Sequence, residues 1–206
     1  MAATARRPDR GEARAALLTA GLRLFADQGY AATTTRQIAA EAGVSHALLR
    51  YHFSSKAGLR EAVDEDVLGS FARSFATARE EGAGRGTLAE AGRAAALVFG
   101  ADRGRRRYLR RVLVDGDERA AQLLGRLVRG AGRELDRLTA DTGALPAESR
   151  RWAAYQVLFL VLGPLLLEPA LEVVLGADPF EPATLADRSA ANQHLLQHGL
   201  LPPHDD

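Results

Sequence analysis

Residues 34–53, TTRQIAAEAGVSHALLRYHF, decide the fold of this chain. They are typical of two short helices joined by a tight turn. Thr34 or Thr35 can cap the first helix, because either hydroxyl can accept a hydrogen bond from a free N–H of the first turn. Gly43 can end that helix, since glycine readily adopts the positive φ angle of a tight turn. Ser45 can cap a second helix that ends near Phe53. This order of elements predicts a helix-turn-helix.

Apolar side chains in the same stretch predict a small core that fixes the angle between the two helices. Ala39 is small where the helices cross, and Val44 is apolar at the corner. Ile38, Leu49 and Phe53 recur at helical spacing and can fill the space between them. The other face of the second helix is then exposed, and its N-terminal turn is suited to base edges and phosphates.

The outward side chains of the second helix are those expected of a helix that reads the DNA major groove. Arg50 can donate two hydrogen bonds to a guanine edge, and His46 lies four residues earlier on the same face. Ala47 or Leu48 can touch a thymine methyl group. The candidate DNA-binding residues are Arg36, Ser45, His46, Ala47, Leu48, Arg50 and Tyr51 near the bases, with Thr35, Tyr51, His52 and Lys56 as phosphate contacts.

The rest of the chain is also predicted to be helical, because Ala and Leu dominate and apolar residues recur at intervals of three and four. A first helix is expected at 11–28, ended by Gly29. Later helices are expected at 55–79, 87–99, 105–114, 118–139, 146–175 and 184–197, with a loop at 80–86 and a turn at 177–182. Pro164 and Pro169 are expected to kink or split one of them, because proline lacks the backbone donor. The predicted fold class is all-α.

Basic residues gather in the first third of the chain. Residues 1–60 hold nine Arg and Lys side chains against four Asp and Glu, a net charge of +5, whereas the remainder has a net charge of −4. The whole chain carries only +1, so its overall charge names no partner. The asymmetry favours contact between the first helices and a polyanion, although solvated helix faces would give the same pattern.

Composition excludes several other classes of protein. The chain has no cysteine, which rules out disulfides and thiol chemistry and fits a reducing compartment. The first 15 residues are charged and lack the apolar segment of a signal peptide. The longest apolar run, 157–167, has 11 residues and is too short for a membrane span. We expect a cytoplasmic protein without membrane contact.

Residues 30–59, YAATTTRQIAAEAGVSHALLRYHFSSKAGL, resemble the N-terminal DNA-binding domain of the tetracycline-repressor (TetR) family of bacterial transcriptional regulators. The resemblance implies a three-helix DNA-binding domain at 1–55 and an effector-binding and dimerisation domain at 56–206. It also implies a homodimer that binds an inverted-repeat operator and is released by a small molecule, most often as a repressor. Arg50 stands where the family most often has tyrosine, and Ala47 where glycine or proline is common, so no operator sequence carries over.

Aromatic side chains of the C-terminal part are candidates for the effector site, since such sites combine apolar walls with a few polar groups. The candidates are Phe71, Phe75, Phe99, Tyr108, Trp152, Tyr155, Gln156 and Phe159. Aromatic residues at helical spacing are also ordinary core residues. The segment 157–175 and the final helix have more apolar surface than one face needs, which favours a subunit interface.

No metal site, cofactor or catalytic motif is predicted. Neither the pair His46 and His52 nor the pair His194 and His198 has a third ligand at suitable spacing. No phosphate-binding loop or nucleophile motif occurs, so an enzyme is not expected. The alternatives are an activator of the same fold, a helical small-molecule-binding protein that never meets DNA, and an enzyme built on a helical bundle. Salt-dependent binding to duplex DNA would favour the regulator, and turnover of a bound molecule the enzyme.

Overall fold

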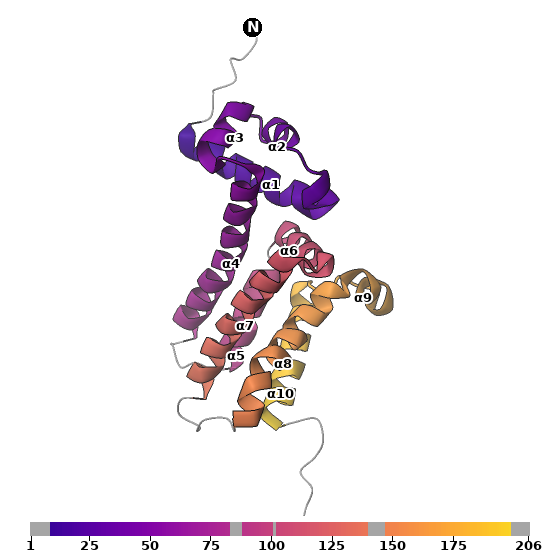
Figure 1. The fold of residues 1–206 in the computed structure, drawn as a ribbon. Helices are drawn as coiled ribbons and strands as arrows, with labels where there is room; N and C mark the ends of the chain where they lie inside the picture. Colours follow the sequence, from indigo (N-terminus) through magenta and orange to yellow (C-terminus); the bar gives the residue numbers. More distant parts are fainter. Residues whose placement is uncertain (1–8, 83–87, 101, 140–146, 199–206) are drawn as a thin grey trace, which may run out of the picture.

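The computed structural model describes residues 9–82, 88–100, 102–139 and 147–198, and within these ranges the chain forms helices and no strands (Figure 1). The predicted all-α fold is confirmed. The helices are α1 (Arg10–Ala32), α2 (Thr35–Glu41), α3 (His46–Phe53), α4 (Lys56–Glu81), α5 (Leu88–Gly100), α6 (Arg103–Asp115), α7 (Glu118–Leu138), α8 (Ala147–Leu166), α9 (Glu168–Leu175) and α10 (Pro182–His198).

The boundaries of α1 and α2 follow from their terminal residues. The helical dihedral angles of α1 break at Gly29, which has a φ of 82°, and one further turn continues to Ala32. Thr34 caps α2 together with Gln37, since each side chain accepts a hydrogen bond from the other residue's backbone N–H. Gly43 has the positive φ, 65°, that the turn after α2 requires. These predictions from the sequence are confirmed.

The prediction that the Ser45 side chain caps α3 is wrong. Ser45 occupies the N-cap position of α3, but its side chain makes no capping hydrogen bond. The N–H of Leu48, which a capping serine would serve, instead donates to the backbone carbonyl oxygen of Ser45 at 3.0 Å. At the next helix, Ser55 does cap, because its Oγ accepts a hydrogen bond from the backbone N–H of Gly58 at 3.0 Å.

The long helix α4 connects the first three helices to a bundle of α5, α7, α8 and α10 (Figure 1). In that bundle α4 packs against α5, α5 against α10, and α7 against α8, while α6 packs against α1. Buried apolar side chains form one cluster that runs from Leu17 in α1 to Leu185 in α10. The core is therefore continuous across position 55, where we expected one domain to end.

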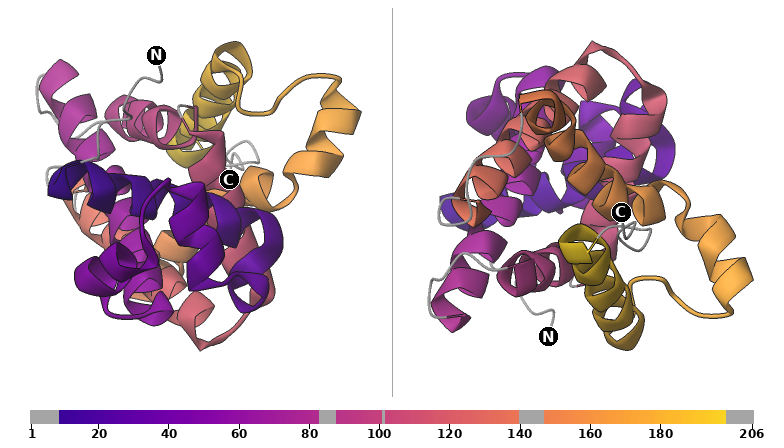
Figure 2. Two further views of the ribbon diagram at one scale, coloured as in Figure 1. Left: turned by 90° about the horizontal axis from the view of Figure 1, so that it is seen from above. Right: turned by 90° about the horizontal axis from the view of Figure 1, so that it is seen from below.

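The chain bends sharply between α8 and α9. Pro164 lies inside α8 without ending it, and the helix stops just before Leu167. Pro169 lies in the first turn of α9, where its missing N–H would be free in any case. The two helical segments are bent by 73° from one another, and α9 projects from the body of the molecule (Figure 2). The expected split is confirmed next to Pro169, whereas Pro164 does not end α8.

No single helix in the described part of the chain is long and apolar enough to cross a membrane, and α8 and α9 pass such a test only as a bent pair.

Candidate DNA interface and ligand cavity

The outer face of α3 lies at the end of the molecule away from the C-terminal bundle (Figure 1). Leu49 and Phe53 are buried and hold the inner face of the helix. His46, Ala47, Arg50 and Tyr51 are exposed, and Tyr51 keeps 65% of its surface accessible. Leu48 is half-buried. The helix thus presents side chains of the chemistry required for base edges on a face that nothing in the described chain covers.

The N-terminal turns of α2 and α3 meet beside this face. The ring Nε2 of His46 lies 2.9 Å from the hydroxyl of Thr35, and Arg36 is exposed next to it. Two N-terminal turns side by side offer free N–H groups to an anion.

Two arginines of α1 lie against α3, and the sequence reasoning did not include them. The guanidinium of Arg10 lies 5.8 Å from the ring centre of Tyr51, and that of Arg14 lies 5.3 Å from the ring centre of Phe53. Both arginines are exposed. The basic N-terminal segment was the signal that could have identified them, but only the fold shows which helix they lie beside.

Lys56 is engaged inside the protein. Its ammonium donates hydrogen bonds to the backbone carbonyl oxygens of Tyr30 and Thr33, both at 2.9 Å, and lies 4.2 Å from the ring centre of Tyr30. Lys56 therefore fixes the end of α1 to the start of α4, and one of its three N–H donors is left for a phosphate. His52 is half-buried, and its covered Nε2 makes no hydrogen bond with the described residues. The phosphate contacts of both residues stay predictions.

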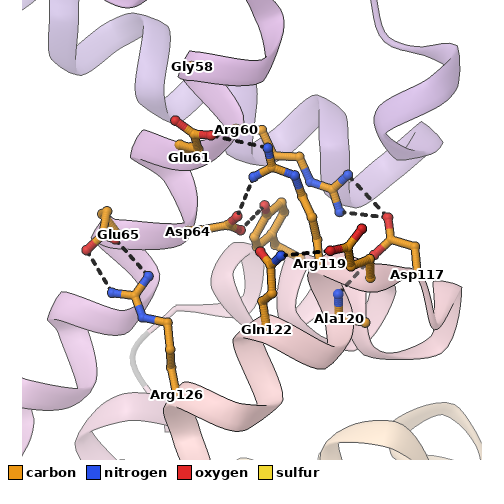
Figure 3. A network of polar contacts seen from close by, with 12 residues as sticks. Gly58, Arg60, Glu61, Asp64, Glu65, Asp117, Arg119, Ala120, Gln122 and Arg126 are labelled. Carbon is orange, nitrogen blue, oxygen red and sulfur yellow. Dashed lines mark hydrogen bonds and ion pairs between the residues drawn. The ribbon is translucent and has the colours of Figure 1, made fainter.

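Polar contacts attach the first half of α4 to α7 (Figure 3). The buried guanidinium of Arg60 lies 3.4 Å from a carboxylate oxygen of Asp117 and 4.7 Å from the ring centre of Tyr30. Asp117 also caps α7 by accepting a hydrogen bond from the N–H of Ala120 at 2.9 Å. This backbone hydrogen bond and the charge of Arg60 hold the pKa of Asp117 below its ordinary value. Arg60 thus joins the end of α1 to the start of α7.

A second group of contacts follows one turn further along α4. The hydroxyl of Tyr108 in α6 donates a hydrogen bond to Asp64 at 2.6 Å. Burial raises the pKa of Asp64, and burial together with the charge of Asp64 raises the pKa of Tyr108 above its ordinary value. Arg126 of α7 forms a two-pronged ion pair with Glu65, at 2.7 and 3.0 Å (Figure 3). These contacts restrain α4 against both α6 and α7.

A cavity of about 660 Å³ lies between α4, α5, α7, α8 and α10. Phe71, Phe75 and Phe99 line it, so the structure brings together three of the eight side chains predicted for an effector site. Its size is that of an ordinary small-molecule site.

The other five predicted side chains do not line this cavity. Tyr108 is bound to Asp64, as described above. Trp152 and Phe159 lie on α8 with 53% and 59% of their surface exposed, and Tyr155 packs between their rings. Gln156 is exposed on the same helix.

The sequence reasoning missed the polar wall of the cavity. Arg188, Ser189, Asn192 and Gln193 of α10 line it, at a spacing that puts them on one helical face. That spacing was visible in the sequence, but the same residues would also suit a solvated surface. Only the packing of α10 against α5 directs them inward.

Three carboxylates near α9 come close enough together to resemble a metal site, namely those of Glu168, Glu172 and Asp178. Each already has an arginine partner: Arg106 lies 3.4 Å from Glu168 and 3.6 Å from Asp178, and Arg103 lies 3.1 Å from Glu172. Their negative charge is thus balanced by arginines, and the group is better described as an ion-pair network than as a cation site.

Residues 17–63 match the family model of the bacterial regulatory proteins of the tetR family, and this range contains the whole α2–α3 unit. This segment of the chain is similar to the DNA-binding segment of that family. No curated protein matches the chain. The resemblance seen in the sequence is confirmed.

Solved structures with a similar fold extend over nearly all of the chain. A candidate fatty acid metabolism regulator from Clostridium perfringens has 17% identity and a TM-score of 0.69, covering 90% of this chain and 98% of the other. A candidate TetR-family transcriptional regulator from Rhodococcus sp. has 19% identity and a TM-score of 0.66, covering 88% and 97%. The multidrug binding protein EbrR in complex with malachite green has 22% identity and a TM-score of 0.61, covering 92% and 98%. At these identities the similarity concerns the fold.

Proposed function

We propose that this TetR-family protein is a homodimeric, sequence-specific DNA-binding transcriptional regulator, acting as a repressor that a small molecule releases from its operator. The observation that carries the proposal is the uncovered face of α3, where His46, Ala47, Arg50 and Tyr51 project from a helix held from behind by buried Leu49 and Phe53. A helix supported in this way on a basic domain is suited to the major groove.

In the proposal, each exposed side chain has a distinct task at the duplex. Arg50 reads a guanine edge, His46 and Arg36 contact neighbouring bases or phosphates, and Ala47 or Leu48 touches a thymine methyl. The phosphate contacts come from Thr35, Tyr51, His52, the third donor of Lys56 and the turn that starts at Ser45. Arg10 and Arg14 add positive charge on the adjoining surface of α1.

The proposed dimer is supported by apolar side chains that the single chain leaves uncovered. Trp152 and Phe159 are exposed on α8, and Val173 and Val174 on α9 keep 83% and 79% of their surface accessible. Surface of this kind is expected to pack against a second copy, and two-fold symmetry would then present two α3 helices to one side of the duplex.

The proposed effector site is the cavity between α4, α5, α7, α8 and α10. One wall of the cavity belongs to α4, the helix that begins at Lys56 beside the DNA-binding helices. A ligand that binds more tightly when α4 is displaced would weaken operator binding, and a coupling of about 1–3 kcal/mol is typical. The complex of EbrR with malachite green supports a small-molecule site in this fold.

In the proposed function residues 1–55 bind DNA, and residues 56–206 bind the effector and the partner subunit. The protein works in the cytoplasm without catalysis.

The Arg50→Ala variant tests the proposed DNA interface. We expect it to weaken operator binding by about 1–3 kcal/mol and to relax specificity at one base pair, because a paired guanine contact is lost. Fluorescence anisotropy with operator and random duplexes over a range of salt concentrations measures both effects. The matched control is Arg73→Ala, which removes an exposed arginine from the distal part of α4 and should leave affinity unchanged. An equal loss on operator and random DNA would remove the base-reading role of Arg50.

A further inference from the structure

The charged residues that line the cavity are mostly arginines. Six arginines and two glutamates contribute to its walls. Both glutamates are neutralised: Glu134 lies 3.1 Å from Arg79 and 3.2 Å from Arg137, and Glu65 lies 2.7 Å from Arg126. The remaining arginines, Arg129, Arg133 and Arg188, have no ion-pair partner among the residues that the structure describes. The cavity therefore has an excess of positive charge.

Arg188 is the arginine of these three that is withdrawn from solvent. It is half-buried on α10, whereas the two arginines of α7 are exposed. One of its N–H groups donates to the backbone carbonyl oxygen of Pro179 at 2.8 Å, and its guanidinium lies 5.1 Å from the ring centre of Phe180. Burial lowers the pKa of Arg188. Its other N–H donors meet no described carboxylate, and a buried charge without a partner is costly.

The surroundings of Arg188 divide the cavity into a polar wall and an apolar wall. Ser189, Asn192 and Gln193 lie on the same face of α10 and supply hydroxyl and amide groups. The apolar wall comes from α4, α5 and α8 and includes Phe71, Phe75, Phe99, Leu158 and Val161. A molecule that fills the cavity would therefore meet a cation and amides at one side and aromatic and aliphatic groups elsewhere.

We infer that the effector of this protein is an amphipathic carboxylic acid, with its carboxylate held by Arg188 and its apolar body against the phenylalanine wall. The inference rests on the proposed function, since it takes this cavity to be the effector site. A guanidinium and a carboxylate match in charge and in hydrogen-bond geometry. An uncharged ligand would leave Arg188 without a counter-charge, and a cationic ligand would meet the excess of arginines.

Three ligands of equal chain length test the inference in the full-length protein. Decanoate is anionic at pH 7, decanamide is uncharged, and decylamine is cationic, while their alkyl chains are nearly the same. Isothermal titration calorimetry should give at least about ten-fold tighter binding of decanoate than of either analogue, which corresponds to about 1.4 kcal/mol. Equal or tighter binding of decanamide or decylamine, or no binding of decanoate, would overturn the inference.

Substitutions at Arg188 then assign the preference to one side chain. Arg188→Gln should reduce decanoate affinity about ten-fold and leave decanamide affinity unchanged, whereas Arg188→Lys should keep the preference for the anion. Arg151→Gln, the same change on an exposed part of α8, is the matched control. An unaltered preference in a folded Arg188→Gln protein would overturn the role of Arg188. Salt-dependent operator binding, measured without ligand, tests the proposed function separately, so the two can fail independently.

Discussion

Gly58 determines how closely α4 approaches α3. It lies in the first turn of α4, and a Cβ atom on it would be 2.2 Å from the backbone carbonyl oxygen of Phe53. No side chain fits at that distance from a backbone atom. Gly58 therefore allows the contact that sets the direction in which α4 leaves the first three helices.

We expect Gly58→Ala to lower the free energy of unfolding by about 2–4 kcal/mol, because the backbone of α3 or α4 must shift to admit the methyl group. Urea denaturation followed by circular dichroism measures the change. The matched control is Gly132→Ala in α7, where an added Cβ meets no atom within 4 Å. That variant should gain about 0.5–1 kcal/mol from the helix preference of alanine. Equal effects of the two substitutions would show that the close approach of Gly58 to the Phe53 carbonyl oxygen leaves room for a methyl group.

Individual residues also show where sequence reasoning succeeds. The outward face of α3 could be predicted, because helical spacing within one short segment separates Arg50 from Leu49 and Phe53. The walls of the cavity could not, since spacing shows that Trp152, Tyr155 and Phe159 share a face but not which helix that face meets. In the structure these three lie outside the cavity, while Phe71 on another helix lines it.

At the scale of helices, most ends could be predicted from local chemistry. Glycines and capping side chains mark the ends of α1 and α2 and the start of α4, because a cap needs only residues close in sequence. Long-range partners could not be predicted. Asp117 caps α7 locally, but its second contact, Arg60, comes from a helix 57 positions earlier in the sequence.

Asp117 both caps α7 and pairs with Arg60, and these two contacts predict a pH dependence of stability. Its folded-state pKa lies below the ordinary value of 3.8, so its charged form contributes stability above that pH, and the contribution is lost as the pH falls through the folded pKa. Asp117→Asn keeps a capping oxygen but does not titrate. We expect wild type to be more stable than the variant by about 0.5–1 kcal/mol at pH 6, a modest value because the carboxylate is half-exposed.

Urea denaturation of both proteins between about pH 6 and pH 3 tests this dependence. The difference in unfolding free energy between them should shrink toward pH 3. A difference that stays constant over this range would show that the charge of Asp117 does not contribute.

At the scale of the whole molecule, a buried ion-pair network joins helices that are distant in sequence. Arg106 of α6 and Glu168 of α9 are both about 4% exposed and lie 3.4 Å apart. Arg106 also donates to the backbone carbonyl oxygen of Phe99 in α5 and packs 4.6 Å from the ring centre of Phe180. Because α6 packs against α1 as well, this network links the C-terminal bundle to the first three helices.

We expect Glu168→Gln to lower the free energy of unfolding by about 3–5 kcal/mol, because it leaves buried arginine charge without its main partner. Glu172→Gln, one turn later on the same helix, removes an exposed ion pair and should change stability by less than about 0.5 kcal/mol. Thermal and urea unfolding of the two variants compare them directly. Similar losses of stability in both variants would show that Glu168 is not the main partner of the buried arginine charge.

DNA reading by a dimer of this protein is tested by selection of tight binders from a random double-stranded DNA library at physiological salt, with the oligomeric state measured alongside. We expect an enriched inverted repeat whose half-sites are centred about 34–36 Å apart, or a small multiple of one helical turn, because two α3 helices must enter grooves on one side of the duplex. Absence of any enriched sequence, with protein shown to be folded and dimeric, would contradict the assignment of α3 as a DNA-reading helix.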